Sequence, residues 1–357
     1  MIDAAPGDAE KPETAAEPSV KAILLVAPAW VGDLVMSQPL LRRLRERHPG
    51  ATLDVFAAPA LLPLVQRLPE VRQGIPHPLR HGELGLAARW RLARSLRQRR
   101  YDQAIVLPNS FKSAWAPFLA GIPQRTGYLG EARWGLLNDI RRLDKQRLPL
   151  MVERFAALAE PAGTAWPRPL PPPRLRVDPQ TVRATLERLG LYPTRPTAVL
   201  CPGAEYGPAK RWPAAYFGDL ARHLSETGHD VWVVGGSADS SLGETIRAQA
   251  GEHCFNLCGR TDLGEAVDVI STARLVVSND SGLMHVAAAL DRPLLALFGS
   301  SSPGFTPPLS PRARVIRLEL PCSPCFQREC PLGHFRCMKD LTPQHVLAHI
   351  TPEFARP

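Results

Sequence analysis

The 357 residues contain no uninterrupted apolar run near the ~18 residues of a membrane-spanning helix. The longest candidate, from Ala22 to Gly32, has only the length of a strand and a turn. The first twenty residues carry five acidic side chains, and the apolar segment typical of a signal peptide does not follow them. We therefore expect no secretory signal. Aromatic residues make up only 6%, and none alternates with basic residues along a strand, which argues against a stacking platform for single-stranded nucleic acid.

Several nucleotide-binding signatures are also missing. The patterns G-x-x-x-x-G-K-[ST] and G-x-G-x-x-G do not occur, so neither a P-loop enzyme nor a Rossmann dehydrogenase is expected. Positive charge, by contrast, is concentrated in one half. Residues 21–160 hold 22 Lys and Arg against 11 Asp and Glu, in a chain of net charge +9. This basic half favours an anionic partner, either nucleic acid or another polyanion.

Short apolar runs alternate with amphipathic stretches twice along the chain, which is typical of parallel βαβ units. A helix is predicted over 34–47, bent near Pro39. The two α/β halves meet at a stretch with six prolines, which we expect to be a stiff extended hinge with a ligand-binding cleft beside it. The predicted units are an acidic disordered tail (1–20), a first α/β domain (21–160), a proline-rich linker (161–178), a second α/β domain (179–340), and a C-terminal helix and tail packing back on the first domain (341–357).

The first strand leads through Gly32 to Asp33 at the start of a helix. One interpretation makes Asp33 the N-cap of this helix, a position that Asp fills well. The other makes it a carboxylate at the rim of the cleft, available as a general base. Both interpretations remain open at this point.

The second half has three comparable loops where predicted strands end. One carries Gly203 and Lys210 and is either a phosphate cradle or an ordinary surface loop. Another runs from Ser278 to His285, so a new helix would begin with free N–H groups that suit an anion, while His285 is either a ligand contact or a packed core residue. The third contains Ser237.

Four of the seven cysteines form a C-x2-C-x4-C-x6-C cluster. Four thiolates at short spacing can hold structural zinc, but the x6 arm is not a usual paired spacing. Free thiols and a disulfide are the other interpretations. The cluster comprises Cys322, Cys325, Cys330 and Cys337.

Five of these segments together resemble the ADP-heptose–lipopolysaccharide heptosyltransferase family, and most closely its heptosyltransferase II members. The resemblance covers residues 20 to 350 in order. It rests on residues 30–33 (WVGD), 107–113 (LPNSFKS), 135–139 (GLLND), 278–285 (SNDSGLMH) and 322–331 (CSPCFQRECP).

The resemblance implies a GT-B architecture, in which two Rossmann-like parallel-sheet domains face each other across a cleft. It implies an inverting transfer of L-glycero-D-manno-heptose from ADP-heptose to the first heptose of the lipopolysaccharide inner core, carried on Kdo2-lipid A. It implies no catalytic cofactor, in keeping with the absence of a D-x-D triplet. A cytoplasmic enzyme, peripheral to the inner membrane and without a nucleic-acid partner, is expected. The basic residues of segments 42–47 and 89–100 would meet the anionic acceptor or the membrane leaflet, or form solvated helix faces.

The resemblance also suggests residue roles. Asp33 matches the proposed base, and Lys210 matches the cation that neutralises the leaving diphosphate. The other expected donor-binding residues are Gly203, Ser237, Thr261, Asp280, Ser281, Gly282, Leu283 and His285. Loop position and the resemblance suggest Asn109, Ser110, Lys112, Arg133 and Asn138 for the acceptor.

Three alternatives stay open. Heptosyltransferases I and III belong to the same family and differ in acceptor. A sugar-nucleotide epimerase would need a second acid/base set, which the sequence does not reveal. A non-catalytic nucleotide or polyanion binder would keep its biological output after substitution of Asp33.

Overall fold

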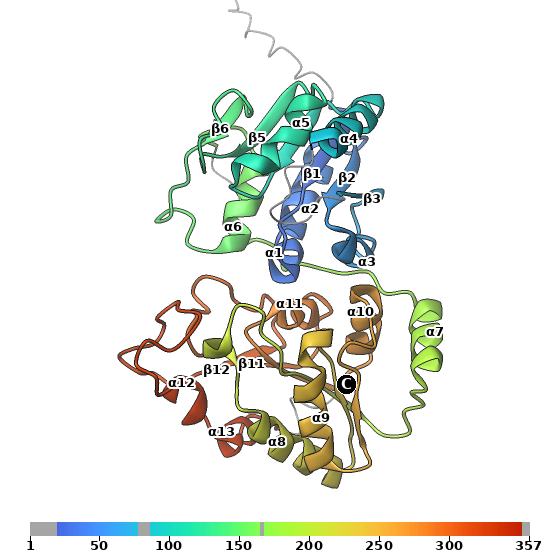
Figure 1. The fold of residues 1–357 in the computed structure, drawn as a ribbon, viewed down its shortest axis with the longest axis vertical. Coiled ribbons are helices and arrows are strands. Elements are labelled where there is room, and N and C mark those ends of the chain that lie inside the picture. Colours follow the sequence, from blue (N-terminus) through green and yellow to red (C-terminus); the bar gives the residue numbers. More distant parts are fainter. Residues whose placement is uncertain (1–19, 78–85, 165–167, 352–357) are drawn as a thin grey trace, which may run out of the picture.

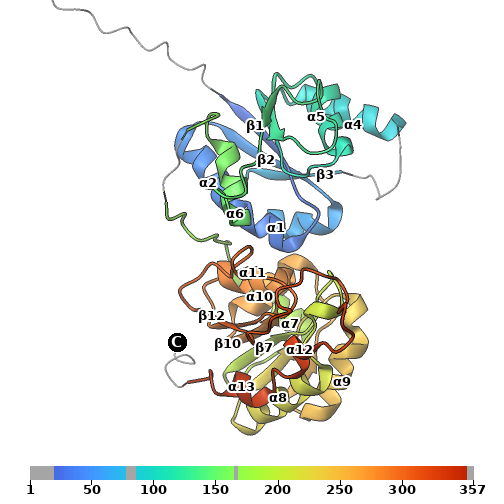
Figure 2. The ribbon, with the colours of Figure 1, turned by 90° about the vertical axis from the view of Figure 1, so that its left-hand side faces the viewer.

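The computed structural model describes residues 20–77, 86–164 and 168–351. The predicted acidic tail therefore lies outside the described residues, except for Val20. The chain forms two α/β domains joined by an extended segment (Figures 1 and 2). Among the described residues, no helix has both the length and the apolar character needed to cross a lipid bilayer.

The first domain has a six-stranded parallel sheet in the order β3-β2-β1-β4-β5-β6. Its central strands are buried runs of Leu, Ile and Val, as expected for a parallel sheet covered on both faces. Its elements are β1 (Ala22–Val26), α1 (Val31–Met36), α2 (Gln38–Arg47), β2 (Thr52–Ala57), α3 (Leu62–Val65), β3 (Gln73–Pro76), α4 (Leu86–Gln98), β4 (Gln103–Val106), α5 (Trp115–Leu119), β5 (Gln124–Tyr128), β6 (Asp139–Arg141) and α6 (Met151–Ala156).

The second domain repeats the same winding, with a parallel sheet in the order β12-β11-β10-β7-β8-β9. Counted from its own first strand, this is again the Rossmann order, so both halves have the predicted fold. Its elements are α7 (Pro179–Leu189), β7 (Thr197–Cys201), α8 (Ala214–Glu226), β8 (Asp230–Val233), α9 (Ser240–Ala250), β9 (Cys254–Asn256), α10 (Leu263–Ser271), β10 (Leu275–Asn279), α11 (Gly282–Ala289), β11 (Leu294–Leu297), β12 (Ala313–Ile316), α12 (Arg336–Lys339) and α13 (Pro343–Leu347).

Two predictions of this architecture are wrong. The helix expected over 34–47 is two helices, because Ser37 ends α1 and also begins α2, with Pro39 accepted in the first turn of α2. The C-terminal helix packs on its own domain rather than on the first one. Leu341 and Val346 are buried in the second domain's core, and the indole of Trp212 donates a 2.6 Å hydrogen bond to the Leu341 carbonyl.

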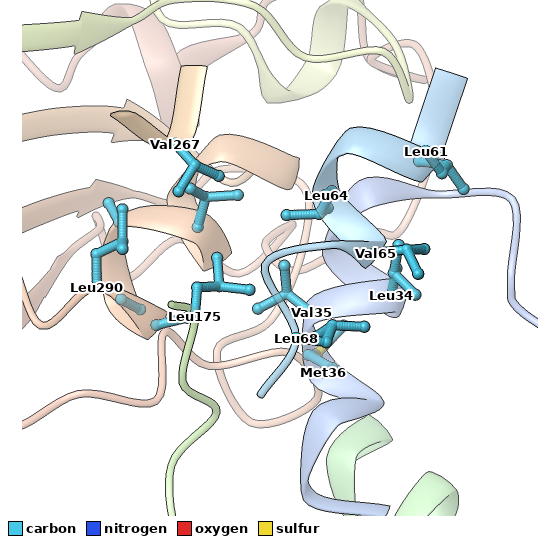
Figure 3. Close-up of a cluster of buried hydrophobic side chains, with 14 of the residues drawn as sticks. Leu34, Val35, Met36, Leu61, Leu64, Val65, Leu68, Leu175, Val267 and Leu290 are labelled. Carbon is cyan, nitrogen blue, oxygen red and sulfur yellow. The ribbon is translucent and has the colours of Figure 1, made fainter. Parts of the chain in front are cut away.

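The domains meet along α1 and α3 of the first and α11 and α10 of the second (Figures 1 and 2). Apolar side chains from both domains pack together there with Leu175 of the linker (Figure 3). The first domain contributes Leu34, Val35, Met36, Leu61, Leu64, Val65 and Leu68, and the second contributes Val267 and Leu290.

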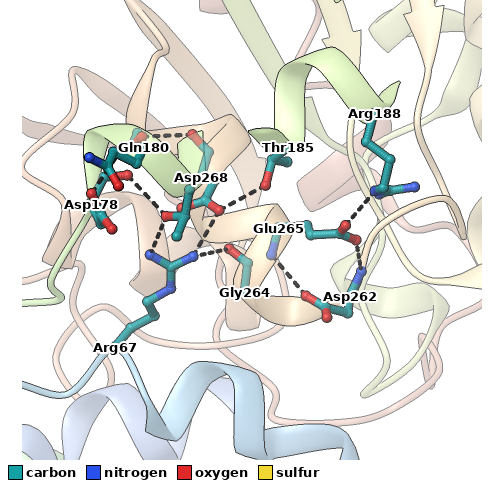
Figure 4. A network of polar contacts seen from close by, with 11 residues as sticks. Arg67, Asp178, Gln180, Thr185, Arg188, Asp262, Gly264, Glu265 and Asp268 are labelled. Carbon is teal, nitrogen blue, oxygen red and sulfur yellow. Dashed lines mark hydrogen bonds and ion pairs between the residues drawn. The ribbon is translucent and has the colours of Figure 1, made fainter. Parts of the chain in front are cut away.

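A buried ion pair reinforces this junction. Arg67, which follows α3, lies 2.8 Å from the carboxylate of Asp268 on α10, and the hydroxyl of Thr185 on α7 donates to the same oxygen (Figure 4). The linker runs alongside, where the Arg176 amide donates a 2.7 Å hydrogen bond to the Arg67 carbonyl. The side of the junction next to the linker is therefore fixed by apolar and ionic contacts, and the carboxyl ends of the central strands face the junction.

Candidate active site

Asp33 lies at this junction, in the first turn of α1. The N-cap of α1 is Trp30, and the helix start has no side-chain capping hydrogen bond, so Asp33 is not the N-cap. Burial raises the pKa of the Asp33 carboxyl to about 6, while the nearby charge of Lys210 acts in the opposite direction. The carboxylate is mostly ionised at neutral pH, but its proton affinity is close to that of an efficient general base.

Two glycines bring α1 against α11. A Cβ on Gly32 would lie 2.8 Å from Cδ2 of His285, and a Cβ on Gly282 would lie 2.6 Å from the Cβ of Val31. Neither position has room for a side chain. This close approach places Asp33 beside the N-terminus of the helix predicted to receive the donor.

The predicted cation is on the facing domain. The ammonium of Lys210 lies 2.6 Å from a carboxylate oxygen of Asp280 and above the ring of Tyr206. Ser301 donates a short hydrogen bond to the same Asp280 oxygen. Asp280 is almost fully buried and its bonded oxygen points at Lys210, so it orients the ammonium. Lysine has three N–H donors, so this ion pair leaves donors for an anion.

The N-terminus of α11 faces the same region. Ser281 is its N-cap and makes no side-chain capping bond, so the amides of the first turn stay available to a ligand. His285 is buried beneath Gly32, and burial lowers its pKa to about 4. His285 is therefore neutral at pH 7 and acts as a packing residue between the domains.

The other predicted donor residues occupy loops at the carboxyl ends of adjacent strands of the second sheet. Gly203 follows β7, and a Cβ there would lie 2.3 Å from the Asp239 carboxylate. Ser237 follows β8, and Thr261 lies between β9 and the Asp262 capping box of α10. Since β10, β7, β8 and β9 are neighbours, the sheet brings the predicted donor residues into one row.

The cysteine-rich segment, residues 322–337, supports the loop that carries Lys210. Arg328 donates from Nε to the Tyr206 carbonyl at 2.7 Å, and its own carbonyl accepts the Ala209 amide at 3.1 Å. The Tyr206 hydroxyl donates to the Phe326 carbonyl at 2.8 Å. Tyr206 thus lies between the cysteine-rich segment and the ammonium of Lys210.

The thiols themselves are all free. Backbone amides lower the pKa of Cys330, and the Phe335 amide donates to its sulfur at 3.4 Å. Within the described residues, no group of three or more Cys, His, Asp and Glu side chains is arranged to hold a metal ion. The described geometry therefore contains free thiols in a folded loop, and the zinc interpretation stays a prediction.

Four of the five predicted acceptor residues gather at one loop, where the Arg133 guanidinium donates to the side-chain oxygen of Asn109 at 3.5 Å, and Asn138 lies apart. Asn109, Ser110 and Lys112 lie after β4 at the junction edge, with Asn109 and Lys112 exposed. Arg133 is buried, and its guanidinium donates to the carbonyls of Pro108 and Tyr128, so it holds two loops together. Asn138 lies at the amino-terminal ends of the strands, on the side of the sheet away from the junction. Its side-chain oxygen accepts a hydrogen bond from the Arg125 amide at the start of β5.

The basic residues of α2 are mostly engaged within the domain. Arg43 donates to Glu160, and Arg45 donates to the carbonyls of Ala51 and Glu70. On α4, by contrast, Arg91, Arg94 and Arg97 have exposed side chains. The solvated-face interpretation therefore does not fit α2. It fits Arg91 and Arg94 of α4, whereas Arg97 donates to the carbonyls of Leu119 and Ala120.

Sequence reasoning missed Ser301, Tyr206 and Arg328. Ser301 lies in an unpatterned loop 21 residues after Asp280, so no local spacing signals their contact. Tyr206 and Arg328 are 122 residues apart in the chain. An aromatic residue four positions before Lys210 was the one available signal.

Two Rossmann-like domains, with a carboxylate on one and a cation beside a helix N-terminus on the other, define a two-domain transferase of the GT-B architecture. The model of the family "Glycosyltransferase family 9 (heptosyltransferase)" matches residues 89–336. The chain belongs to this family.

Curated relatives agree over nearly the whole chain. Lipopolysaccharide heptosyltransferase 2 of Escherichia coli is 49% identical over 337 residues, covering 92% of this chain and 97% of that protein. Its counterpart in Salmonella typhimurium is 48% identical over the same shares. The solved structure of E. coli ADP-heptose lps heptosyltransferase II superposes with a TM-score of 0.84 at 46% identity, covering 94% of this chain and 98% of that one. E. coli heptosyltransferase WaaC with ADP, at 21% identity and a TM-score of 0.71, shares the fold.

Proposed function

We propose that the protein transfers L-glycero-D-manno-heptose from ADP-heptose to the first heptose of the lipopolysaccharide inner core. Two relatives named lipopolysaccharide heptosyltransferase 2, at 49% and 48% identity, support this proposal. The observation that carries its chemistry is the position of Asp33 on one domain across the junction from Lys210 on the other, close enough for the lysine charge to lower the pKa of the Asp33 carboxyl against the effect of burial.

In the proposed reaction, Asp33 takes the proton of the acceptor hydroxyl as that oxygen bonds to the anomeric carbon of heptose. The bond from this carbon to the diphosphate oxygen breaks, and ADP leaves with the electron pair. Attack from the face opposite the leaving group inverts the anomeric centre. The transition state has oxocarbenium character, as in other glycosyl transfers.

Charge develops on the leaving diphosphate, and two groups would neutralise it. The Lys210 ammonium supplies a positive charge that Asp280 and Ser301 hold in place. The amides at the start of α11, from Gly282 and Leu283, would donate to phosphate oxygens, with the helix dipole adding to the attraction. In this assignment Asp280 orients Lys210 and does not itself face the phosphate.

The row of loops at Gly203, Ser237 and Thr261 would extend the donor site from the diphosphate toward the nucleoside. Adenine would lie nearest Thr261. On the acceptor side, Asn109, Ser110 and Lys112 remain proposed contacts, because their loop lies at the junction edge. Arg133 would act by supporting that loop.

We expect the transfer to need no cofactor or catalytic metal, so a chelator such as EDTA should leave turnover unchanged. Restoration of a lost activity by Mg²⁺ would contradict this. A cytoplasmic enzyme that meets its lipid acceptor at the inner membrane leaflet would present the exposed arginines of α4 to anionic headgroups.

The deciding experiment is a transfer assay with ADP-heptose and purified Kdo2-lipid A acceptors carrying either no heptose or one heptose. The proposal predicts turnover with the one-heptose acceptor only. Turnover with the heptose-free acceptor would indicate a heptosyltransferase I. Asp33→Asn, run in parallel, should retain ADP binding and lose about 10²–10⁴-fold in turnover, the usual contribution of a general base. Retained turnover in this variant would remove Asp33 from the chemistry.

A further inference from the structure

Three large aromatic side chains are exposed on loops that follow three neighbouring strands of the first domain. Trp30 is 47% exposed, Phe111 38% and Trp134 68%. They follow β1, β4 and β5, which are adjacent strands of the sheet. We call these three residues the aromatic row. None of them belongs to the hydrophobic clusters of the domain.

The loops that carry Phe111 and Trp134 are joined to each other. The Phe111 amide donates to the Glu131 carboxylate at 2.7 Å, and the Glu131 amide donates to the Asn109 carbonyl at 3.1 Å. Buried Arg133 binds carbonyls of both loops. These contacts hold the outer two aromatics on one supported surface rather than on independent loops.

Trp30 is next to the proposed base. It is the N-cap of α1, and its carbonyl accepts the Leu34 amide at 3.0 Å, which fixes its backbone at the start of the helix. Asp33 follows three residues later, in the first turn of the same helix. A sugar bound with a hydroxyl at Asp33 would therefore lie near the start of α1, where the Trp30 side chain is exposed.

Exposed aromatic rings on these loops are suited to binding a sugar. A pyranose ring is polar at its rim but presents C–H groups on its faces, and these pack on flat aromatic surfaces. Large apolar side chains gathered on one exposed surface are typical of binding sites. Phe111 also contacts the ring of Trp115 edge to face, with the ring centroids 5.9 Å apart. Lys112, adjacent to Phe111 and exposed, adds a cation suited to a sugar-acid carboxylate.

We propose that the aromatic row is the binding track for the acceptor oligosaccharide, beginning at Trp30 and running outward through Phe111 to Trp134. This inference rests on the proposed function, and it adds the aromatic side chains of Trp30, Phe111 and Trp134 to the polar residues considered above for the acceptor. Trp30 packs on the sugar that is glycosylated. Phe111 and Lys112 meet the following acidic sugar, and Trp134 meets the more distant part of the glycolipid.

The test compares Trp30→Ala and Trp30→Phe with Trp90→Ala, which removes another exposed indole of the same domain. Trp30→Ala should raise the KM for a one-heptose acceptor about five- to tenfold, the range of a lost aromatic contact, and leave the KM for ADP-heptose unchanged. Trp30→Phe should restore most of the loss, and Trp90→Ala should match the wild type.

A binding measurement separates this inference from the proposed function. Acceptor added without ADP-heptose should quench tryptophan emission in the wild type and in Trp90→Ala, but less in Trp30→Ala. If wild-type protein transfers heptose and Trp30→Ala keeps the wild-type acceptor KM and quenching, the aromatic row is wrong and the proposed function stands. If the wild type transfers no heptose to any core acceptor, the proposed function is wrong, and the aromatic row, which rests on it, is wrong as well.

Trp134→Ala tests the direction of the track. It should raise the KM for the full glycolipid acceptor and leave the KM for a short heptosyl-Kdo fragment unchanged. An equal effect on both acceptors, or none on either, would overturn the outward assignment.

Discussion

Gly32 on α1 and His285 on α11 touch across the domain junction without room for one more carbon atom. A Cβ on Gly32 would lie 2.8 Å from Cδ2 of the His285 ring. The next residue along α1 is Asp33, and the first turn of α11 is the proposed diphosphate site. The spacing between the base and the leaving group is therefore set by a contact between the backbone of one domain and a buried, neutral imidazole of the other.

Gly32→Ala should push the two helices apart. We expect it to lower the free energy of unfolding by about 1–3 kcal/mol, as overpacking does, and to reduce kcat by displacing Asp33. Denaturant titration and transfer kinetics measure the two effects. Gly50→Ala is the matched control, because no atom lies within 4 Å of its added Cβ. Wild-type kcat in Gly32→Ala would show that the junction tolerates the shift.

Lys210→Ala should weaken use of the donor. The variant removes the cation that the proposal places beside the diphosphate, and we expect kcat/KM for ADP-heptose to fall about 10²-fold or more. Lys339→Ala, which removes a lysine from the surface of the same domain, serves as control. Steady-state kinetics with varied ADP-heptose provide the measurement, and a fall confined to the acceptor KM would place Lys210 outside the donor site.

Arg67→Met should destabilise the junction next to the linker. The variant leaves the buried Asp268 carboxylate without its ionic partner, which costs about 3–5 kcal/mol in comparable buried pairs. Arg222→Ala, which breaks an exposed pair with Asp219, should change little. Thermal and denaturant unfolding would report both. Equal stability of the two variants would mean that Asp268 finds another partner or water.

The fold was largely predictable because its signals are local. Buried runs such as the one at β1 alternate with amphipathic helices, and this alternation specifies two parallel sheets. The sequence shows no such run at β6, β9 and β12, because these are edge strands of only three or four residues. Placement of the last helix failed for another reason. An apolar face shows that a helix packs, but not against which domain.

The site was predictable only in part, for a related reason. Asp33, Lys210 and the start of α11 each follow a strand, and parallel strands bring such loops to one edge. Ser301 and Arg328 contact the site through tertiary structure, at distances along the chain that form no recognisable sequence motif. Asn138 shows the reverse error. The loop that contains Asn138 begins at the carboxyl end of β5, next to the junction. By Asn138 the chain has returned to the amino-terminal ends of the strands, where β6 begins.

The effect of pH separates the role of Asp33 in catalysis from its effect on stability. Its folded-state pKa of about 6 exceeds the ordinary 3.8, so the folded protein binds this proton more readily than the unfolded chain. The stability contributed by this group therefore rises as pH falls through about 6 and is complete below 3.8, while the ionised base needed for turnover disappears.

The most direct test of the central claim is the pH dependence of kcat/KM for heptose transfer. With Asp33 as the base, the rate should be level above pH 7 and fall toward tenfold per unit below a midpoint of about 6. His285 cannot supply this midpoint, because its pKa is about 4. A profile that stays level down to pH 5, with the protein still folded, would contradict the assignment of Asp33 as the group that takes the acceptor's proton.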